Sequence, residues 1–132
     1  MKTGLTPGAT LTRTIVIDRP RTIDFLGEDL RIYSTPQMVL DCEQTCRELA
    51  LSVCDAGEDS VGTGISVSHK GSTLLGMTVD VTATVKAVEG RRIDFAIMVR
   101  DHVEEISSGD HSRFVVSIEK VRARVAEKKA RG

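Results

Sequence analysis

Apolar and polar residues alternate along much of this chain, and alternation with a period of two is typical of β-strands. An early stretch from Leu11 to Ile17 predicts a first strand, which Asp18-Arg19-Pro20 ends. After residue 60 the alternation returns in four stretches that are separated by turn residues such as Glu89-Gly90, a hairpin signal. Their apolar or same-face positions are Thr63, Ile65, Val67 and His69; Val79, Val81, Ala83 and Val85; Ile93, Phe95, Ile97 and Val99; and the run from Ile106 to Val121.

One segment has helical periodicity instead. Ser34-Thr35-Pro36 is typical of a helix start, because a hydroxyl side chain can cap the helix and proline has no N–H to leave unpaired there. Apolar residues then recur at steps of three and four until Asp55-Ala56-Gly57, where glycine can end a helix. We expect one helix of roughly 19 residues, about 28 Å long. Its apolar positions are Met38, Val39, Cys42, Cys46, Leu49, Ala50 and Val53.

This order of elements predicts an α+β fold. A strand, a long helix and four further strands can form a five-stranded antiparallel sheet wrapped around one helix, which is the hotdog arrangement. The length of 132 residues fits a single domain, residues 1–132, with one core. The segment from Arg21 to Tyr33 has no dominant period, so we expect a loop or short helix that could act as a lid.

The basic C-terminal end, about residues 122–132, is expected to be a solvated strand end and frayed tail. The alternative is that one or two of its cations bind the phosphates of a nucleotide-tailed ligand.

Composition excludes several partners. Hydrophobic residues make up 40% and aromatic residues 3%, so branched aliphatic side chains must fill the core. The net charge of −1, from 18 basic and 19 acidic residues, gives no field typical of binding to nucleic acid or to a membrane surface. The N-terminal run has no apolar core of a signal peptide, and no apolar run could span a bilayer, so we expect a cytoplasmic protein.

The cysteine spacing and the absence of common motifs disfavour several kinds of site. Cys42, Cys46 and Cys54 lie at helical spacing, and core packing of reduced thiols is favoured over metal ligation because no CxxC or HxxxH pair completes a site. The chain has no P-loop, no GxGxxG after a strand and no GxSxG elbow, which disfavours nucleotide hydrolysis, dinucleotide binding and α/β-hydrolase chemistry. We expect no cofactor and no metal.

Three residues could carry chemistry, although each also has a structural interpretation. His69 lies on an apolar face, where it is either a hydrogen-bonded core histidine or a functional base. Glu43 can pair with Arg47 one helical turn later, or can orient an imidazole or act as a general base. Thr35 can be a helix cap. Local sequence alone favours the structural interpretation of all three.

From Thr35 onward the chain resembles the fluoroacetyl-CoA thioesterase-like branch of the hotdog thioesterases. The similar features are the Thr-x7-Glu spacing from Thr35 to Glu43, Val61-Gly62-Thr63 entering a strand that ends in His69, and Gly76 at the next turn. The resemblance continues through Val88-Glu89-Gly90-Arg91-Arg92 and through the run from Glu105 to Arg113.

The resemblance implies hydrolysis of a short or modified acyl-CoA thioester by Thr35, Glu43 and His69. His69 would be the base for Thr35 or for water, and Glu43 would orient the imidazole or promote the water. Gly62, Thr63 and Arg113 are the implied substrate-binding residues. Backbone N–H groups at the helix start or near Gly62 are candidate donors to the carbonyl oxygen.

Two features limit what the resemblance implies. The segment before Thr35 is shorter than in the fluoroacetyl-CoA enzyme and offers only Phe25 and Tyr33 as aromatic residues, so selectivity for fluoroacetyl-CoA is not implied. Thr35 and Glu43 would lie about 12 Å apart along a helix. Either the loop folds back or a second protomer supplies one member, and the resemblance implies a homodimer or a dimer of dimers.

Two other functions remain as hypotheses. A non-hydrolytic module that binds acyl-CoA could have kept the same fold, because a fold does not fix a function. A hydratase or dehydratase is disfavoured, because no Asp/His pair stands in the expected strand-to-helix context.

Overall fold

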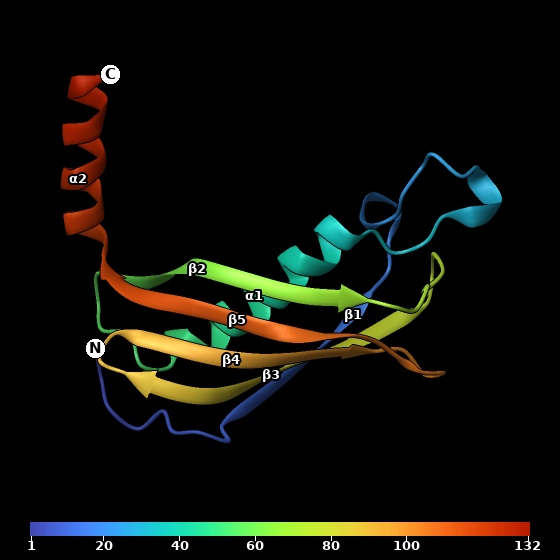
Figure 1. Cartoon of the computed structure of the whole chain (residues 1–132), viewed down its shortest axis with the longest axis horizontal. Coiled ribbons are helices and arrows are strands. Elements are labelled where there is room, and N and C mark those ends of the chain that lie inside the picture. Colours follow the sequence, from blue (N-terminus) through green and yellow to red (C-terminus); the bar gives the residue numbers. More distant parts are fainter.

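The computed structural model describes all 132 residues and has the predicted α+β architecture. Five strands form one antiparallel sheet in the order β1-β3-β4-β5-β2, and helix α1 (Thr35–Leu51) crosses one face of it and contacts all five strands (Figure 1). No helix is long and apolar enough to cross a membrane. The strands are β1 (Thr10–Val16), β2 (Glu58–His69), β3 (Thr78–Glu89), β4 (Arg92–Arg100) and β5 (Glu105–Ser117).

The core lies between α1 and the inner face of the sheet. Alternate residues of β3 and β4 point inward, and the helix contributes a stripe at steps of four, so the two predicted periodicities meet in one apolar layer. Tyr33 and Phe95 are its only aromatic members, as the composition required. The contributing side chains are Met38, Cys42, Cys46 and Ala50 from α1, Val79, Val81, Ala83 and Val85 from β3, and Ile93, Phe95, Ile97 and Val99 from β4.

The ends of α1 differ in detail from the prediction. Ser34 is the N-cap, with its hydroxyl accepting a bond from the Gln37 N–H, and Thr35 is the first helical residue. The helix has 17 residues and ends at Leu51, because Ser52 donates its hydroxyl to the Leu49 carbonyl and the chain then turns. The capping interpretation of Thr35 was therefore wrong, and its hydroxyl is available for another contact.

Strand β2 is an edge of the sheet. It pairs with β5 on one side only, and residues 61–66 are exposed. The register with β5 shifts between Gly62 and Gly64, which makes Thr63 the extra residue of a β-bulge. Beyond the bulge Ile65, Val67 and His69 share the inner face, as the alternation predicted.

The segment between β1 and α1 is folded rather than extended. It contains two single-turn 3-10 helices, Arg19–Arg21 and Glu28–Leu30, and its two ends meet in an isolated bridge between Thr22 and Tyr33. A second bridge joins Ile32 to Leu74. The segment lies at the end of the molecule where β2 finishes (Figure 1).

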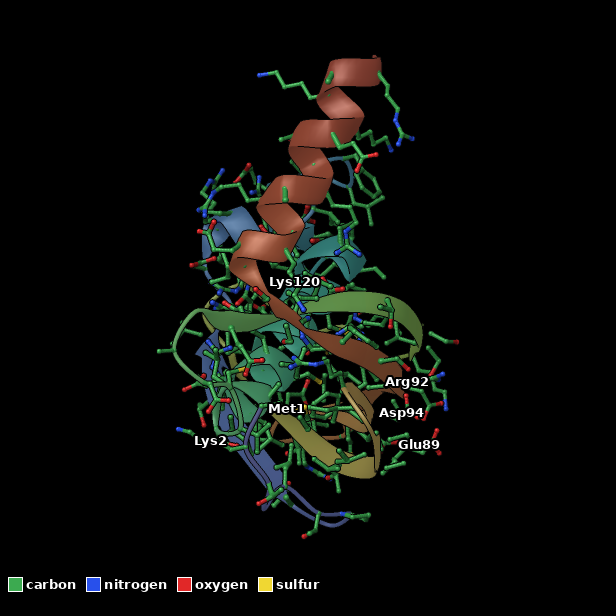
Figure 2. The ribbon with its side chains drawn as sticks, turned by 90° about the vertical axis from the view of Figure 1, so that its left-hand side faces the viewer. Met1, Lys2, Glu89, Arg92, Asp94 and Lys120 are labelled. Carbon is green, nitrogen blue, oxygen red and sulfur yellow. The ribbon has the colours of Figure 1, made fainter.

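The C-terminal end corrects the prediction of a strand end and frayed tail. Strand β5 stops at Ser117, and residues Ile118–Arg131 form helix α2, which stands away from the sheet (Figures 1 and 2). Ser117 caps it by accepting from the Lys120 N–H, and basic side chains occupy its last turn, where the helix dipole favours them. None of its residues is buried, so the helix is stabilised by its cap and by the charges at its end, and not by packing against the core.

Candidate active site

Thr35 and His69 are brought together by the fold. Thr35 Oγ1 at the start of α1 and His69 Nδ1 at the end of β2 share a hydrogen bond of 2.8 Å. The ring of Tyr33 stands edge-on to the imidazole, with the centroids 6.2 Å apart. Burial lowers the pKa of His69 below its usual 6.5, and the Gly71 backbone, as an acceptor for a ring N–H, opposes the shift. The imidazole is therefore neutral at neutral pH and can accept a proton.

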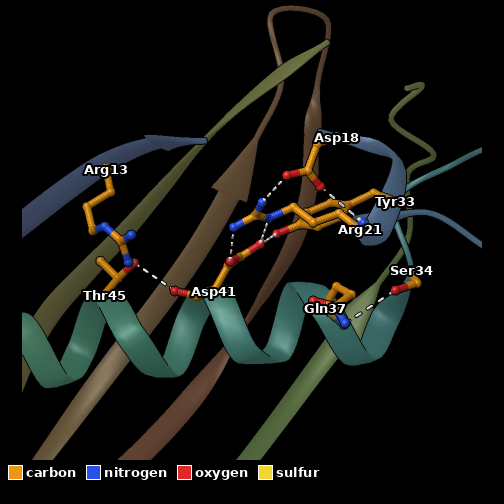
Figure 3. A network of polar contacts seen from close by, with 8 residues as sticks. All are labelled: Arg13, Asp18, Arg21, Tyr33, Ser34, Gln37, Asp41 and Thr45. Atoms are coloured by element: carbon orange, nitrogen blue, oxygen red, sulfur yellow. Dashed lines mark hydrogen bonds and ion pairs between the residues drawn. The ribbon is translucent and has the colours of Figure 1, made fainter. Parts of the chain in front are cut away.

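A buried carboxylate holds Tyr33 in this position (Figure 3). The Tyr33 hydroxyl donates to Asp41 Oδ2 at 2.5 Å, and Arg21 binds both oxygens of the same carboxylate at 2.9 and 3.1 Å. Arg21 also binds Asp18 at 2.8 Å. The network ties both ends of the segment between β1 and α1 to the first turns of the helix, and it thereby fixes the wall of the site beside His69.

A pocket of about 350 Å³ opens over the Thr35 and His69 pair. Its apolar lining comes mostly from the segment before α1, where Phe25 is 76% exposed and Leu26 is 51% exposed. Exposed apolar side chains beside a polar pair are typical of a site that closes over a partly apolar ligand. The remaining lining residues are Ile23, Ile32, Tyr33, Ser34, Lys70, Gly71 and Ser72.

Glu43 does not join Thr35 and His69 within this chain. It lies two helical turns further along α1, beside Gly62, His111 and Arg113. A Cβ atom at Gly62 would stand 3.1 Å from Glu43 Oε1 and 3.1 Å from His111 Cε1, so only glycine fits there without displacing a neighbour. The expected pair of Glu43 with Arg47 is absent, because Arg47 binds Asp59 at 2.6 Å.

The three side chains around Gly62 form a second polar group. Arg113 is 6% exposed; its Nε donates to Ser60 Oγ at 2.7 Å, and its other nitrogens bond to the Ser60 carbonyl and to His111 Nε2. His111 Nδ1 lies 2.8 Å from the Gly64 carbonyl, so Nδ1 carries the proton and Nε2 accepts. Burial, chiefly, lowers the pKa of both His111 and Arg113.

The other implied binding residue, Thr63, lies exposed at the bulge of β2, and its hydroxyl donates to the Ser112 carbonyl at 3.1 Å. The thiols of Cys42 and Cys46 are fully buried, and burial raises the pKa of each to about 12. They pack in the core as the spacing suggested, and neither is a usable nucleophile.

Sequence reasoning missed the buried supports of the site. Asp41 lies directly before Cys42 on the buried side of α1. Because a buried carboxylate needs hydrogen-bond partners, this position in the sequence could have indicated a buried polar network. Its partners Tyr33 and Arg21 could not be identified, because the segment that carries them has no periodicity. Ser60, which binds Arg113, gave no signal, since a buried serine looks like any strand residue.

Comparison with known proteins gives a consistent assignment. Residues 17–119 match the sequence family described as fluoroacetyl-CoA-specific thioesterase. The fluoroacetyl-CoA thioesterase of Streptantibioticus cattleyicolor is 35% identical over 139 aligned positions that cover all of both chains.

Solved structures agree with this comparison. A variant of a fluoroacetyl-CoA-specific thioesterase superposes with a TM-score of 0.88 at 35% identity, covering 96% of this chain and 99% of the other. The same variant has been solved with fluoroacetate and CoA, with a TM-score of 0.81 at 34% identity over 88% of this chain and 98% of that one. A hot-dog-like protein from Thermanaerovibrio acidaminovorans has a TM-score of 0.85 at 25% identity, covering 92% of this chain and 91% of its own, so the fold is a hotdog.

Proposed function

Because this chain belongs to the family of fluoroacetyl-CoA-specific thioesterases, it is an acyl-CoA thioester hydrolase, and we propose that it cleaves a short or modified acyl-CoA at the pocket that holds Thr35 and His69. The observation that carries the proposal is the 2.8 Å contact between Thr35 Oγ1 and His69 Nδ1. A hydroxyl held against an unprotonated imidazole nitrogen is the arrangement by which histidine activates a nucleophile.

The proposed reaction uses His69 as the base. Its Nδ1 takes a proton from the Thr35 hydroxyl, or from a water that Thr35 positions, as the oxygen attacks the thioester carbonyl carbon. The resulting oxyanion would be stabilised at the start of α1, where the helix dipole favours negative charge and the Thr35 N–H is the donor left free by Pro36 and by the cap. His69 then returns the proton to the departing CoA sulfur, which releases CoA. If water was the nucleophile, the free acid forms in the same displacement. If Thr35 was the nucleophile, its acyl ester is hydrolysed by a water that His69 activates, which releases the free acid and restores the Thr35 hydroxyl.

The proposed substrate follows from the pocket and the relatives. A volume of about 350 Å³ with a partly apolar lining fits a small acyl group. The solved relative with fluoroacetate and CoA supports binding of the CoA part. Phe25 and Leu26 on the segment before α1 would contact the acyl group and so determine which acyl groups the enzyme prefers. We do not propose selectivity for fluoroacetyl-CoA.

We propose further that a second subunit supplies Glu43. Residues 61–66 of the edge strand β2 are exposed, and Val61 and Ile65 are 44% and 36% exposed, so this edge can pair with a copy of itself. An antiparallel pairing with the two-fold axis at Ser66, and with Thr63 left out of the ladder as the bulge residue, places Gly62 of the partner subunit opposite His69. Glu43 of the partner subunit, which lies beside that Gly62, would then reach the Thr35 and His69 pair.

A mixing experiment tests this arrangement. His69→Ala and Glu43→Gln are prepared as separate inactive proteins and then refolded together in equal amounts. If the site is shared, each mixed dimer contains one intact site, and about a quarter of the wild-type activity returns. If Glu43 acts within its own subunit, no intact site can form and the mixture stays inactive. Sedimentation equilibrium gives the size of the assembly independently.

The hydrolase assignment is tested with a panel of acyl-CoA esters and a thiol reagent that reports free CoA. The expected result is thiol release with short or modified acyl groups, abolished in His69→Ala. The competing hypothesis, a non-hydrolytic acyl-CoA-binding module, predicts saturable binding of the same esters without thiol release. Absence of turnover with every ester would show that hydrolysis is wrong.

A further inference from the structure

Two buried side-chain polar atoms in this protein lack a hydrogen-bond partner within the chain, His69 Nε2 and Ser107 Oγ. Nearly all buried polar groups in folded proteins are hydrogen-bonded, because an unpaired donor or acceptor loses its water without replacement. An exception therefore calls for a physical explanation, and here both exceptions lie in the same part of the fold.

The register of the sheet places the two residues side by side. His69 at the end of β2 is directly opposite Ser107 on β5, and paired residues of neighbouring strands point to the same face. Ser107 lies in the inward-facing row of β5 together with His111 and Arg113, and it is 2% exposed. The side chain of Ser107 therefore lies on the same side of the sheet as the imidazole.

The other neighbours of Ser107 on this face are apolar. On β4 its pair is Val99, which is fully buried, and the next inward residue of β5 is Gly109, which has no side chain. Among these neighbours only His69 offers a polar group. Of the residues adjacent to Ser107 on this face of the sheet, the only polar one is thus His69, the proposed base.

The chemistry of His69 requires an acceptor at Nε2. Thr35 occupies Nδ1, and Nδ1 can remove a proton from the Thr35 hydroxyl only while it is itself unprotonated. In a neutral imidazole the proton then lies on Nε2, and an acceptor there selects this tautomer. A hydroxyl oxygen is such an acceptor. Unlike a carboxylate, it adds no negative charge and so leaves the base neutral.

We propose that Ser107 is a positioning residue for catalysis, which accepts the His69 Nε2–H directly or through one bridging water and so holds the imidazole in the tautomer that can deprotonate at Nδ1. The inference rests on the proposed function of Thr35 and His69. Tyr33, which stands edge-on to the ring, and Lys70, the next residue of the chain, are other polar side chains beside it in the same pocket. The Gly71 backbone is the competing acceptor.

Ser107→Ala removes the acceptor and keeps the volume close to the original. We expect kcat to fall roughly 10- to 100-fold with little change in KM, as for loss of other groups that orient a functional histidine. Ser108→Ala is the matched control, because Ser108 is the next residue of β5 and points to the opposite face. It should keep the activity of the parent protein.

Nitrogen-15 NMR of the His69 ring provides a readout that a merely structural role would not move. The ring should carry its proton on Nε2 in the parent protein and in Ser108→Ala, and should become a mixture of tautomers in Ser107→Ala. An unchanged tautomer together with unchanged kcat in a folded Ser107→Ala protein would overturn the proposal and identify Gly71 as the acceptor. Because the tautomer is measured without substrate, this result is independent of whether the chain hydrolyses acyl-CoA.

Discussion

The hydroxyl of Thr35 and the imidazole of His69 are hydrogen-bonded at 2.8 Å although 34 positions separate them in the chain. The contact forms because α1 starts, and β2 ends, at the same edge of the molecule. Ser34 takes the capping role, and the neighbouring hydroxyl is thereby left for the histidine.

Substitution of His69 by alanine should abolish most of the activity. We expect kcat to fall by about 100-fold or more, because a positioned base typically contributes that much to proton transfer. Thr35→Ser, which keeps the hydroxyl, should lose far less than Thr35→Ala. Thiol release from acyl-CoA measures all three variants. His102→Ala, an exposed histidine in the turn after β4, is the control and should match the parent.

Activity should depend on pH through the neutral form of His69. Burial lowers the pKa of His69 below 6.5, so the base stays unprotonated at neutral pH and is lost only on further acidification. We therefore expect a plateau in kcat/KM above pH 6.5 and a decline as pH falls through the lowered pKa. A pH profile of kcat/KM measures this. A decline that begins above pH 7 would contradict the assignment of His69 as a base in a desolvated site.

Stability should fall with pH over the same range because His111 is buried in its neutral form. The pKa of His111 in the folded protein lies below 6.5, its value in the unfolded chain. Between these two pKa values the unfolded chain therefore binds more protons than the folded protein. The contribution of neutral His111 to the free energy of unfolding is complete above pH 6.5 and is lost as pH falls through the pKa of the folded protein. Urea unfolding at a series of pH values measures the trend, and an NMR titration of the His111 ring assigns it. A free energy of unfolding that stays level from pH 7 to 5.5 would contradict this prediction.

Replacing Tyr33 by phenylalanine should destabilise the protein. The Asp41 carboxylate would lose a buried hydroxyl donor, which costs about 1–3 kcal/mol in the free energy of unfolding. Urea denaturation measures the loss, and amide hydrogen exchange should increase in residues 22–32. Thr12→Ala is a control, because it removes an exposed hydroxyl pair with Thr82 and should change the free energy by about 0.5 kcal/mol or less.

Two glycines of β2 should respond differently to alanine. At Gly62 the new Cβ would press on Glu43 and His111 at 3.1 Å, so Gly62→Ala should displace Glu43 and lower kcat by roughly tenfold or more. At Gly64 the Cβ would meet nothing within 4 Å, and Gly64→Ala should keep most of the activity. Thiol release compares the two variants, and equal losses in both would show that the space around Glu43 does not matter.

Helix α2 should be dispensable for folding. None of its residues is buried, so removal of residues 122–132 should change the free energy of unfolding by less than about 1 kcal/mol. If its cations bind the CoA phosphates, the truncated protein should show a higher KM that becomes insensitive to salt, with an unchanged kcat. Steady-state kinetics at two salt concentrations distinguish this from an unused helix.

Sequence alone determined the fold and the position of each candidate. The two periodicities place Val79 to Val99 and the stripe from Met38 to Ala50 in one core, because a residue's face follows directly from its spacing along a strand or a helix. The order of the elements and the matched motifs then indicated the family. The C-terminal helix could not be predicted in this way. The residues before it are typical of a strand, and none of its own residues is buried in the core.

Only the tertiary structure decided which side chains meet. A hydroxyl at a helix start can cap that helix or face a strand, and Ser34 and Thr35 are equivalent candidates until β2 is placed beside them. In the same way, spacing along α1 could not show that Glu43 lies with Gly62, His111 and Arg113 and away from His69. Contacts between distant segments depend on register and packing, which no local pattern encodes. The structure thus resolves the three residues into a Thr35 and His69 pair and a separate Glu43.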